Sequence, residues 1–173
     1  ATFIPVLRAR LVGSAGPVAP GEVVINEIKP TEAGSPGFVE LFNRSPASVA
    51  LGGFEVIDST GHRFQIPAGV LLGPGQRRVF TDAELGFAVV LSGATYALVG
   101  DDGMTFVDGL DPRPGDPGEN GFSFGRYPDG DGDSYVLRTP TSGGANLFER
   151  TSSIVINEIH YHPATPAEPE WVE

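Results

Sequence analysis

Near its start the chain reads Val23-Val24-Ile25-Asn26-Glu27-Ile28, and the same pattern returns as Ile154-Val155-Ile156-Asn157-Glu158-Ile159. Each copy is followed by a proline-containing loop and then by an aromatic residue, Val and Glu, as Phe38-Val39-Glu40 and Trp171-Val172-Glu173. The spacing between the copies is the length of a domain and too long for a solenoid repeat. The repeat therefore predicts a complete domain over residues 22–148, a linker over 149–153, and the first strands of a second, truncated copy over 154–173.

Between the two copies the pattern predicts only β-strands. Val23–Ile28 is apolar on both faces apart from Asn26 and Glu27, as expected for a strand inside a sandwich. Phe38–Asn43 alternates, with Val39 and Leu41 on one face. Turn residues recur every 8 to 12 positions or so, which favours a sandwich with Greek-key or immunoglobulin-like topology. The further predicted strands are Phe54–Ile57, Arg63–Ile66, Arg77–Phe80, Tyr96–Val99, Met104–Val107, Gly121–Gly125 and Tyr135–Leu137.

Two local features complete this prediction. Asp82–Phe87 is the one helical candidate, and it is long enough for a single turn only. Gly73-Pro74-Gly75-Gln76 has Pro second and Gly third, as a type II turn requires. Residues 1–21 are interpreted as a linker or the end of a preceding element, although Phe3-Ile4 and Val6-Leu7 could form an edge strand.

Composition excludes several classes of protein. The chain has 173 residues, with 24 Gly, 16 Pro, no Cys and a net charge of −11. Without cysteine there is no disulfide framework, thiolate zinc site or cysteine nucleophile. Binding to nucleic-acid phosphates needs a basic stripe, yet the only adjacent basic pair is Arg77-Arg78. No stretch reaches the length of a membrane span, and the first residues lack the basic start of a signal peptide.

Several of these segments together resemble the lamin tail domain as it occurs in bacteria. The likeness covers about residues 23–146 and begins again at Ile154. The matching segments are Val24-Ile25-Asn26-Glu27-Ile28, Phe38-Val39-Glu40-Leu41-Phe42-Asn43-Arg44-Ser45, Leu51-Gly52-Gly53-Phe54 with Asp58, Leu72-Gly73-Pro74-Gly75, Gly125-Arg126-Tyr127-Pro128-Asp129-Gly130 and Pro140-Thr141-Ser142-Gly143-Gly144-Ala145-Asn146.

The resemblance implies an all-β, immunoglobulin-like β-sandwich that is not an enzyme. It also implies a module of large secreted or surface-attached bacterial proteins, found beside hydrolase or CotH-type kinase domains. The second copy, with His160-Tyr161-His162-Pro163, looks most like tandem copies that precede CotH-type domains. No catalytic residue is carried over, because the family motif contains none.

The sharpest candidate for a ligand site is Asp129-Gly130-Asp131-Gly132-Asp133. Alternating carboxylates supply hard oxygen ligands on a tight turn, which makes these three aspartates candidate calcium ligands. The distal Glu of an EF-hand loop is missing, because position 140 is Pro. The alternative is an exposed turn between two strands.

Other polar groups have simpler interpretations. Asp101-Asp102-Gly103 and the acids between Asp108 and Glu119 are expected to be solvated turns rather than further calcium ligands. His160 and His162 would share a face of a strand, but no third His or Cys is near them in sequence.

Two pairs of glutamates could be interpreted as the paired carboxylates of a glycosidase: Glu27 with Glu40, and Glu158 with Glu173. Without a substrate cleft we expect them to be strand residues whose oxygens are satisfied by backbone or Arg. No serine-nucleophile elbow, phosphate-binding glycine loop or zinc-protease motif occurs in the sequence. The phenylalanines on the predicted strands are expected in the core rather than in a binding patch: Phe54, Phe64, Phe80, Phe106, Phe122 and Phe124.

The predicted function is that of a non-catalytic module that spaces, presents or anchors neighbouring domains through protein or glycan contacts. Two alternatives stay open, a calcium-stabilised adhesion module and an accessory substrate-binding domain of a hydrolase. The strand Ile154–Ile159 is expected to dock on a sheet edge, either of its own sandwich or of a second chain in a swapped or strand-added dimer.

Overall fold

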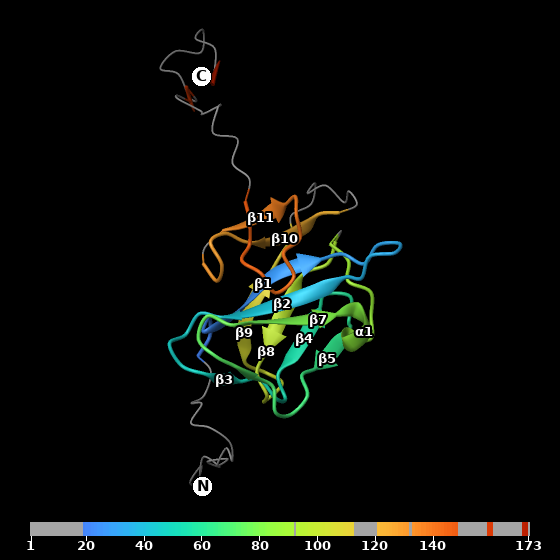
Figure 1. The fold of residues 1–173 in the computed structure, drawn as a ribbon, viewed down its shortest axis with the longest axis vertical. Helices are drawn as coiled ribbons and strands as arrows, with labels where there is room; N and C mark the ends of the chain where they lie inside the picture. Colours follow the sequence, from blue (N-terminus) through green and yellow to red (C-terminus); the bar gives the residue numbers. More distant parts are fainter. Residues whose placement is uncertain are drawn as a thin grey trace.

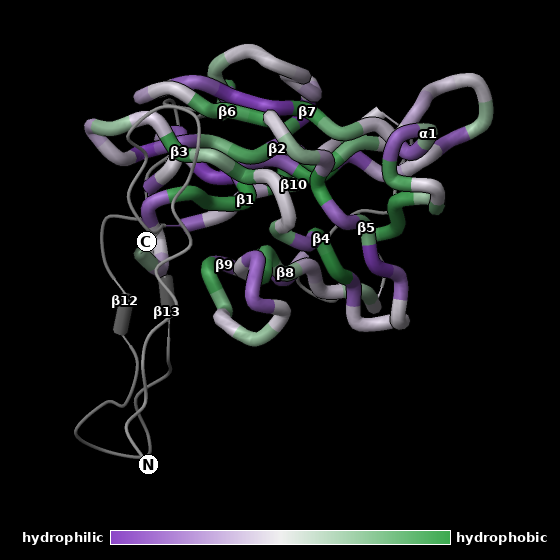
Figure 2. Tube along the Cα trace, turned by 90° about the horizontal axis from the view of Figure 1, so that it is seen from below, coloured by the Kyte–Doolittle hydropathy of each residue, from purple (hydrophilic) through white to green (hydrophobic). Residues whose placement is uncertain are grey.

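The structure, a computed structural model, describes residues 19–91, 93–112, 121–131 and 133–148, and the backbone of residues 159–160 and 171–172. One layer is an antiparallel sheet with the strand order β11-β10-β1-β2-β7. It forms the upper layer in Figure 2 and contains the two strands that carry the repeated motifs of the first copy, Val23–Ile28 and Phe38–Glu40. Its strands are β1 (Val23–Lys29), β2 (Phe38–Asn43), β7 (Arg77–Thr81), β10 (Ser123–Arg126) and β11 (Ser134–Leu137).

The second layer is an antiparallel sheet with the order β5-β4-β8-β9. It lies across the first layer, as Figures 1 and 2 show, so the described domain is a β-sandwich and the all-β prediction is confirmed. Its strands are β4 (Glu55–Asp58), β5 (Arg63–Gln65), β8 (Tyr96–Val99) and β9 (Phe106–Leu110), and a small separate sheet pairs β3 (Val49–Ala50) with β6 (Leu71–Leu72).

The core lies between the two layers. Val39 and Leu41 of β2 lie two positions apart on the same face of the strand, and both are fully buried. They pack with Val56 and Leu98 of the second sheet and with Phe80 of β7. Removing this apolar surface from water supplies the main driving force for folding.

The short helix α1 (Asp82–Leu85) is held at both ends. Thr81 and Glu84 form a reciprocal capping box at its start, and Gly86 ends it with a φ of 78°. The predicted helical turn is therefore confirmed, although it ends two residues before Phe87. The predicted type II turn is also present, with Gly75 at a φ of 67° and Gln76 N donating to Gly73 O.

Two parts of the strand prediction were wrong. β9 begins at Phe106 rather than Met104, because the Asp102 carboxylate accepts hydrogen bonds from the backbone of Met104 and Thr105 and holds both in a turn. β3 and β6 were not predicted. Each has two residues, too few to show any alternation.

Residues 127–146, which we call the closing segment, include the edge strand β11, and the parts before and after β11 lie over the outer face of the five-stranded sheet. The closing segment crosses β1 and β2 in Figure 1. Phe38 and Glu40 point to this outer face, opposite to Val39 and Leu41, yet neither is more than 5% exposed. The closing segment thus adds a partial third layer to the sandwich.

Two strands of the second copy are described, β12 (Ile159–His160) and β13 (Trp171–Val172). Ile159 lies opposite Val172 and His160 opposite Trp171, as Ile28 lies opposite Val39 and Lys29 opposite Phe38 in the first copy. Corresponding motif residues therefore pair in the same register. Residues 154–158 lie outside the described part of the chain, so the docking of this strand on a sheet edge stays a prediction.

Candidate functional site

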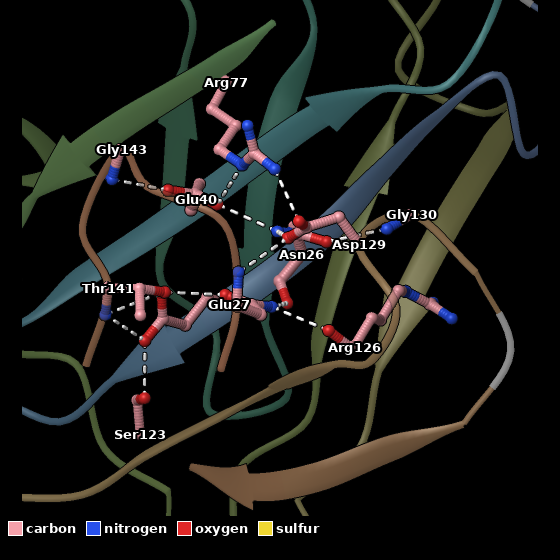
Figure 3. Close-up of polar contacts among 11 residues, drawn as sticks. Asn26, Glu27, Glu40, Arg77, Ser123, Arg126, Asp129, Gly130, Thr141 and Gly143 are labelled. Atoms are coloured by element: carbon pink, nitrogen blue, oxygen red, sulfur yellow. Dashed lines mark hydrogen bonds and ion pairs between the residues drawn. The ribbon is translucent and has the colours of Figure 1, made fainter. Parts of the chain in front are cut away.

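A β-bulge in β1 sets the arrangement of Asn26, Glu27 and Glu40, the polar residues of the two repeated motifs, which we call the signature residues. Ile25 lies opposite Leu41 of β2 and Glu27 lies opposite Glu40, which leaves Asn26 as an extra residue. Such a bulge re-aims the side chains around it. Asn26, Glu27 and Glu40 are all 0% exposed and contact the closing segment (Figure 3).

Asn26 joins the sheet to the closing segment through its side-chain amide. Its Nδ2 donates to Glu40 Oε1 at 2.9 Å and to Asp129 Oδ1 at 2.8 Å. Its Oδ1 accepts from Gly130 N at 2.9 Å. Both amide protons and the carbonyl oxygen are therefore engaged inside the domain.

The Glu27 carboxyl is enclosed by one backbone amide and two hydroxyl groups. Oε1 accepts from Ser123 Oγ of β10 at 2.5 Å and from Thr141 N at 3.0 Å. The hydroxyl oxygen of Thr141 lies 2.8 Å from Oε2. Two strands and the closing segment therefore meet at this carboxyl.

The Glu40 carboxyl accepts from Asn26 and, at 2.7 Å, from Gly143 N of the closing segment. Arg77 Nε of β7 stands 3.7 Å away, too far for a hydrogen bond. Burial raises the pKa of Glu40 to about 7, and the charge of Glu27 acts in the same direction, against the hydrogen bonds and Arg77.

Asp129 is also turned into this cluster. Its Oδ2 pairs with Arg77 Nη2 at 2.5 Å, and its Oδ1 accepts from the backbone of Asn146 at 3.1 Å. The Arg77 guanidinium lies over the Phe42 ring, 4.9 Å from its centroid. The first of the three predicted calcium ligands is thus part of an internal ion pair.

Two glycines permit these close contacts. A Cβ on Gly130 would stand 2.6 Å from the Phe42 ring, and the φ of Gly130 is 71°. A Cβ on Gly125 would stand 2.8 Å from Asn26 O and 2.9 Å from the amide nitrogen of Asn146. The Asn146 amide donates to the backbone oxygens of Asn26 and Arg126. Because Gly125 has no side chain, it leaves room for these two hydrogen bonds.

The three candidate calcium ligands do not face one another as a set. Asp129 points inward, whereas Asp131 and Asp133 are exposed. Within the described ranges, no three His, Cys, Asp or Glu residues are grouped so that they could hold a metal ion. Calcium binding by this loop stays a prediction without a geometric argument in its favour.

The other acidic candidates divide into two kinds. Asp102 caps its own loop as expected of an exposed turn, and hydrogen bonds from Thr105 and Met104 lower its pKa to about 2. Asp108 is not a solvated turn residue, so that prediction was wrong. Its carboxylate accepts from Ile25 N at 2.7 Å and pairs with Arg126 at 3.0 Å, which ties the two sheets together.

Several predicted site residues cannot be placed. His162, Glu158 and Glu173 lie outside the described residues, as do residues 113–120, and only the backbone of His160 is described. Among the strand phenylalanines, Phe54, Phe80 and Phe124 are buried as predicted. Phe106 is 59% exposed and departs from that prediction.

This arrangement holds the fold together and offers no reaction centre among the described residues. A glycosidase needs two carboxyl groups on either side of an open substrate site. Glu27 and Glu40 are instead neighbours on paired strands, fully buried, with their oxygens occupied by internal partners. Sequence reasoning expected satisfied strand residues here but missed the partners Ser123, Thr141 and Gly143, which are about 100 positions away or more and carry no local signal.

The comparisons with known proteins agree with this architecture. No curated protein and no solved structure matches the chain. The sequence model of the Lamin Tail Domain matches residues 17–143, more than half of the chain, and this stretch includes β1, β2 and most of the closing segment. The match and the antiparallel sandwich together confirm the immunoglobulin-like fold. The chain belongs to the lamin tail domain family.

Proposed function

We propose that this domain is a non-catalytic module that spaces or anchors neighbouring domains of a larger secreted or cell-surface protein. The observation that carries the proposal is the complete burial of Asn26, Glu27 and Glu40. The most distinctive polar side chains of the domain are used to hold its own closing segment, so the domain acts through its shape and surface. No helix within the described residues is long and apolar enough to cross a membrane.

The path of the chain suits a spacer. The described chain enters near β3 and leaves beyond the closing segment next to β11, at opposite ends of the domain in Figure 1. Phe148 is fixed at the exit by its ring contacts with Tyr127 and Tyr135. A rigid sandwich with its ends far apart holds its neighbours at a set separation.

A tandem arrangement is part of this proposal. The shared register of β12 with β13 and of β1 with β2 supports a second copy of the domain that begins at Ile154. A linker over residues 149–153, as the sequence pattern predicts, would keep successive copies close together in the chain.

The spacing role can be tested by distance measurement, because the chain has no native cysteine. The substitutions Ala19→Cys and Leu147→Cys place labels at exposed positions near the two ends. Single-molecule energy transfer should give one narrow distribution of label distances, which broadens only when the domain unfolds. A broad distribution under native conditions would contradict a spacer.

A contact surface for a protein or glycan is the second part of the proposal. Around the β8–β9 turn, Met104 is 85% exposed and Phe106 is 59% exposed, which is unusual for large apolar side chains. An accessory substrate-binding domain would use such an aromatic. Binding on a glycan array that is lost in Phe106→Ala would favour that candidate, whereas an array without binding would leave protein contacts as the role of this surface.

A further inference from the structure

The buried cluster under the closing segment has more carboxyl groups than positive charges. Glu27 of β1, Glu40 of β2 and Asp129 of the closing segment face it, and Arg77 of β7 is the cation beside Glu40 and Asp129. Nearby guanidinium groups are directed elsewhere: Arg126 pairs with Asp108, and Arg44 donates to Gly130 O. Three ionised carboxylates in a cluster with one guanidinium would leave an uncompensated charge in a buried site, which is costly.

Hydrogen-bond accounting also points to an additional proton. The Asn146 amide nitrogen donates to the carbonyl oxygens of Asn26 and Arg126, so its Oδ1 is left as an acceptor. That Oδ1 lies 2.8 Å from the hydroxyl of Thr141. The same hydroxyl lies 2.8 Å from Glu27 Oε2.

A hydroxyl group has one proton and cannot donate to two acceptors at full strength. If Thr141 donates to Asn146, its 2.8 Å contact with Glu27 needs a proton from the glutamic acid side. Oε1 of Glu27 can remain an acceptor, because Ser123 Oγ and Thr141 N both donate to it. The contacts therefore form a complete set when the carboxyl pair carries a proton.

We propose that the Glu27–Glu40 pair retains one proton in the folded domain, and that loss of this proton loosens the closing segment. The two groups lie directly opposite each other on paired strands, so a charge on Glu27 makes the ionised form of Glu40 less favourable, and we assign the proton to the pair. Gly143 and Thr141 bind these carboxyls through their backbone amides. Repulsion between two charges would act at the points where the closing segment is attached.

The direction of the pH effect follows from the raised pKa of Glu40, about 7 in the folded domain against an ordinary value of 4.5. Between these values the folded domain binds more protons than the unfolded chain, so this contribution to stability is complete below pH 4.5 and is lost as the pH rises through 7. One additional bound proton makes the unfolding equilibrium constant rise about tenfold per pH unit within that window.

The first experiment measures unfolding in urea from pH 5 to 8 for the wild-type chain, Glu27→Gln and Glu40→Gln. At least one of these variants should lose about a tenfold change per pH unit relative to wild type, because each substitution removes one of the two carboxylates that would otherwise repel each other. Glu55→Gln is the control, since Glu55 lies on the other sheet and pairs with Arg63 at the surface. If both cluster variants keep the wild-type pH dependence, the proposal is overturned.

A second experiment needs no substitution and so does not depend on a variant folding. Amide hydrogen exchange of the wild-type chain is followed at pH 6, 7 and 8, with correction for the intrinsic effect of pH. Protection at Thr141 and Gly143 should fall more steeply than protection at Val56, in the core of the other sheet. Equal losses of protection at all three amides would overturn the proposal that the closing segment loosens when the proton is lost.

Discussion

Two acidic glycine turns in this domain have the same local character and opposite roles. Asp129-Gly130 and Asp102-Gly103 both place a glycine in the left-handed region, at φ values of 71° and 69°. Asp129 binds Asn26, Arg77 and Asn146, whereas Asp102 binds only its own loop through Met104 and Thr105. One turn fastens the outer layer of the domain and the other reverses the chain between β8 and β9.

The difference shows that distant residues decide what an acidic turn does. The partners of Asp129 on β1 and β7 are 103 and 52 positions away in the sequence. Asp102 finds its partners within three positions. Composition around the two turns therefore predicts where the chain bends, but not whether the bend is buried.

The largest difference in stability is expected between alanine substitutions at the two glycines, Gly130 and Gly103. Gly130→Ala forces a Cβ against the Phe42 ring in a left-handed conformation, so we expect a loss of about 4 kcal/mol in the free energy of unfolding. Gly103→Ala has the same backbone strain but no atom within 4 Å of the new Cβ, so we expect about 1 kcal/mol. Urea denaturation measures both, and equal losses would show that Gly130 is not packed against the sheet.

A smaller difference is expected between the two aspartates. Asp129→Ala removes the short ion pair of the Arg77 guanidinium and one of the two acceptors of the Asn26 amide in a largely buried site, which should cost about 3 kcal/mol. Asp102→Ala removes hydrogen bonds in a solvent-exposed loop and should cost much less. The same denaturation experiment compares them, and the account fails if Asp102→Ala is the more damaging change.

The sequence was sufficient to predict a β-sandwich and most of its strands. The alternation in Phe38–Asn43 predicted that Val39 and Leu41 share one face of a strand, and the structure buries both of them between the two layers. The glycines and prolines marked the turns, including the type II turn at Gly75. Apolar period and turn chemistry are local properties, so they can be recognised without knowledge of the fold.

The closing segment could not be predicted in the same way. Asn26 and Glu27 stood out as polar residues in an otherwise apolar strand, which is a signal that they need buried partners. Nothing local identified those partners as Ser123, Thr141 and Asp129, or showed that a bulge would leave Asn26 free to bond to Asp129. The alternating carboxylates around Asp129 suggested a ligand site. The ion pair of Asp129 with Arg77 could not be predicted, because it depends on tertiary contacts.

The smallest expected effect concerns calcium. Because Asp129 is bound to Arg77, only Asp131 and Asp133 of the candidate set face solvent, and we expect millimolar Ca²⁺ to leave the melting temperature unchanged. Thermal unfolding with and without Ca²⁺, with excess chelator as the reference, tests this. A rise that Asp131→Ala abolishes would instead support the calcium-stabilised adhesion module.

The central claim, that the signature residue Asn26 acts by holding the closing segment, is tested most directly by a double-mutant cycle. Unfolding free energies are measured for wild type, Asn26→Ala, Asp129→Ala and the double variant. The hydrogen bond between these buried side chains predicts a coupling energy of about 2 kcal/mol. Additive losses, with a coupling below about 0.5 kcal/mol, would contradict the claim.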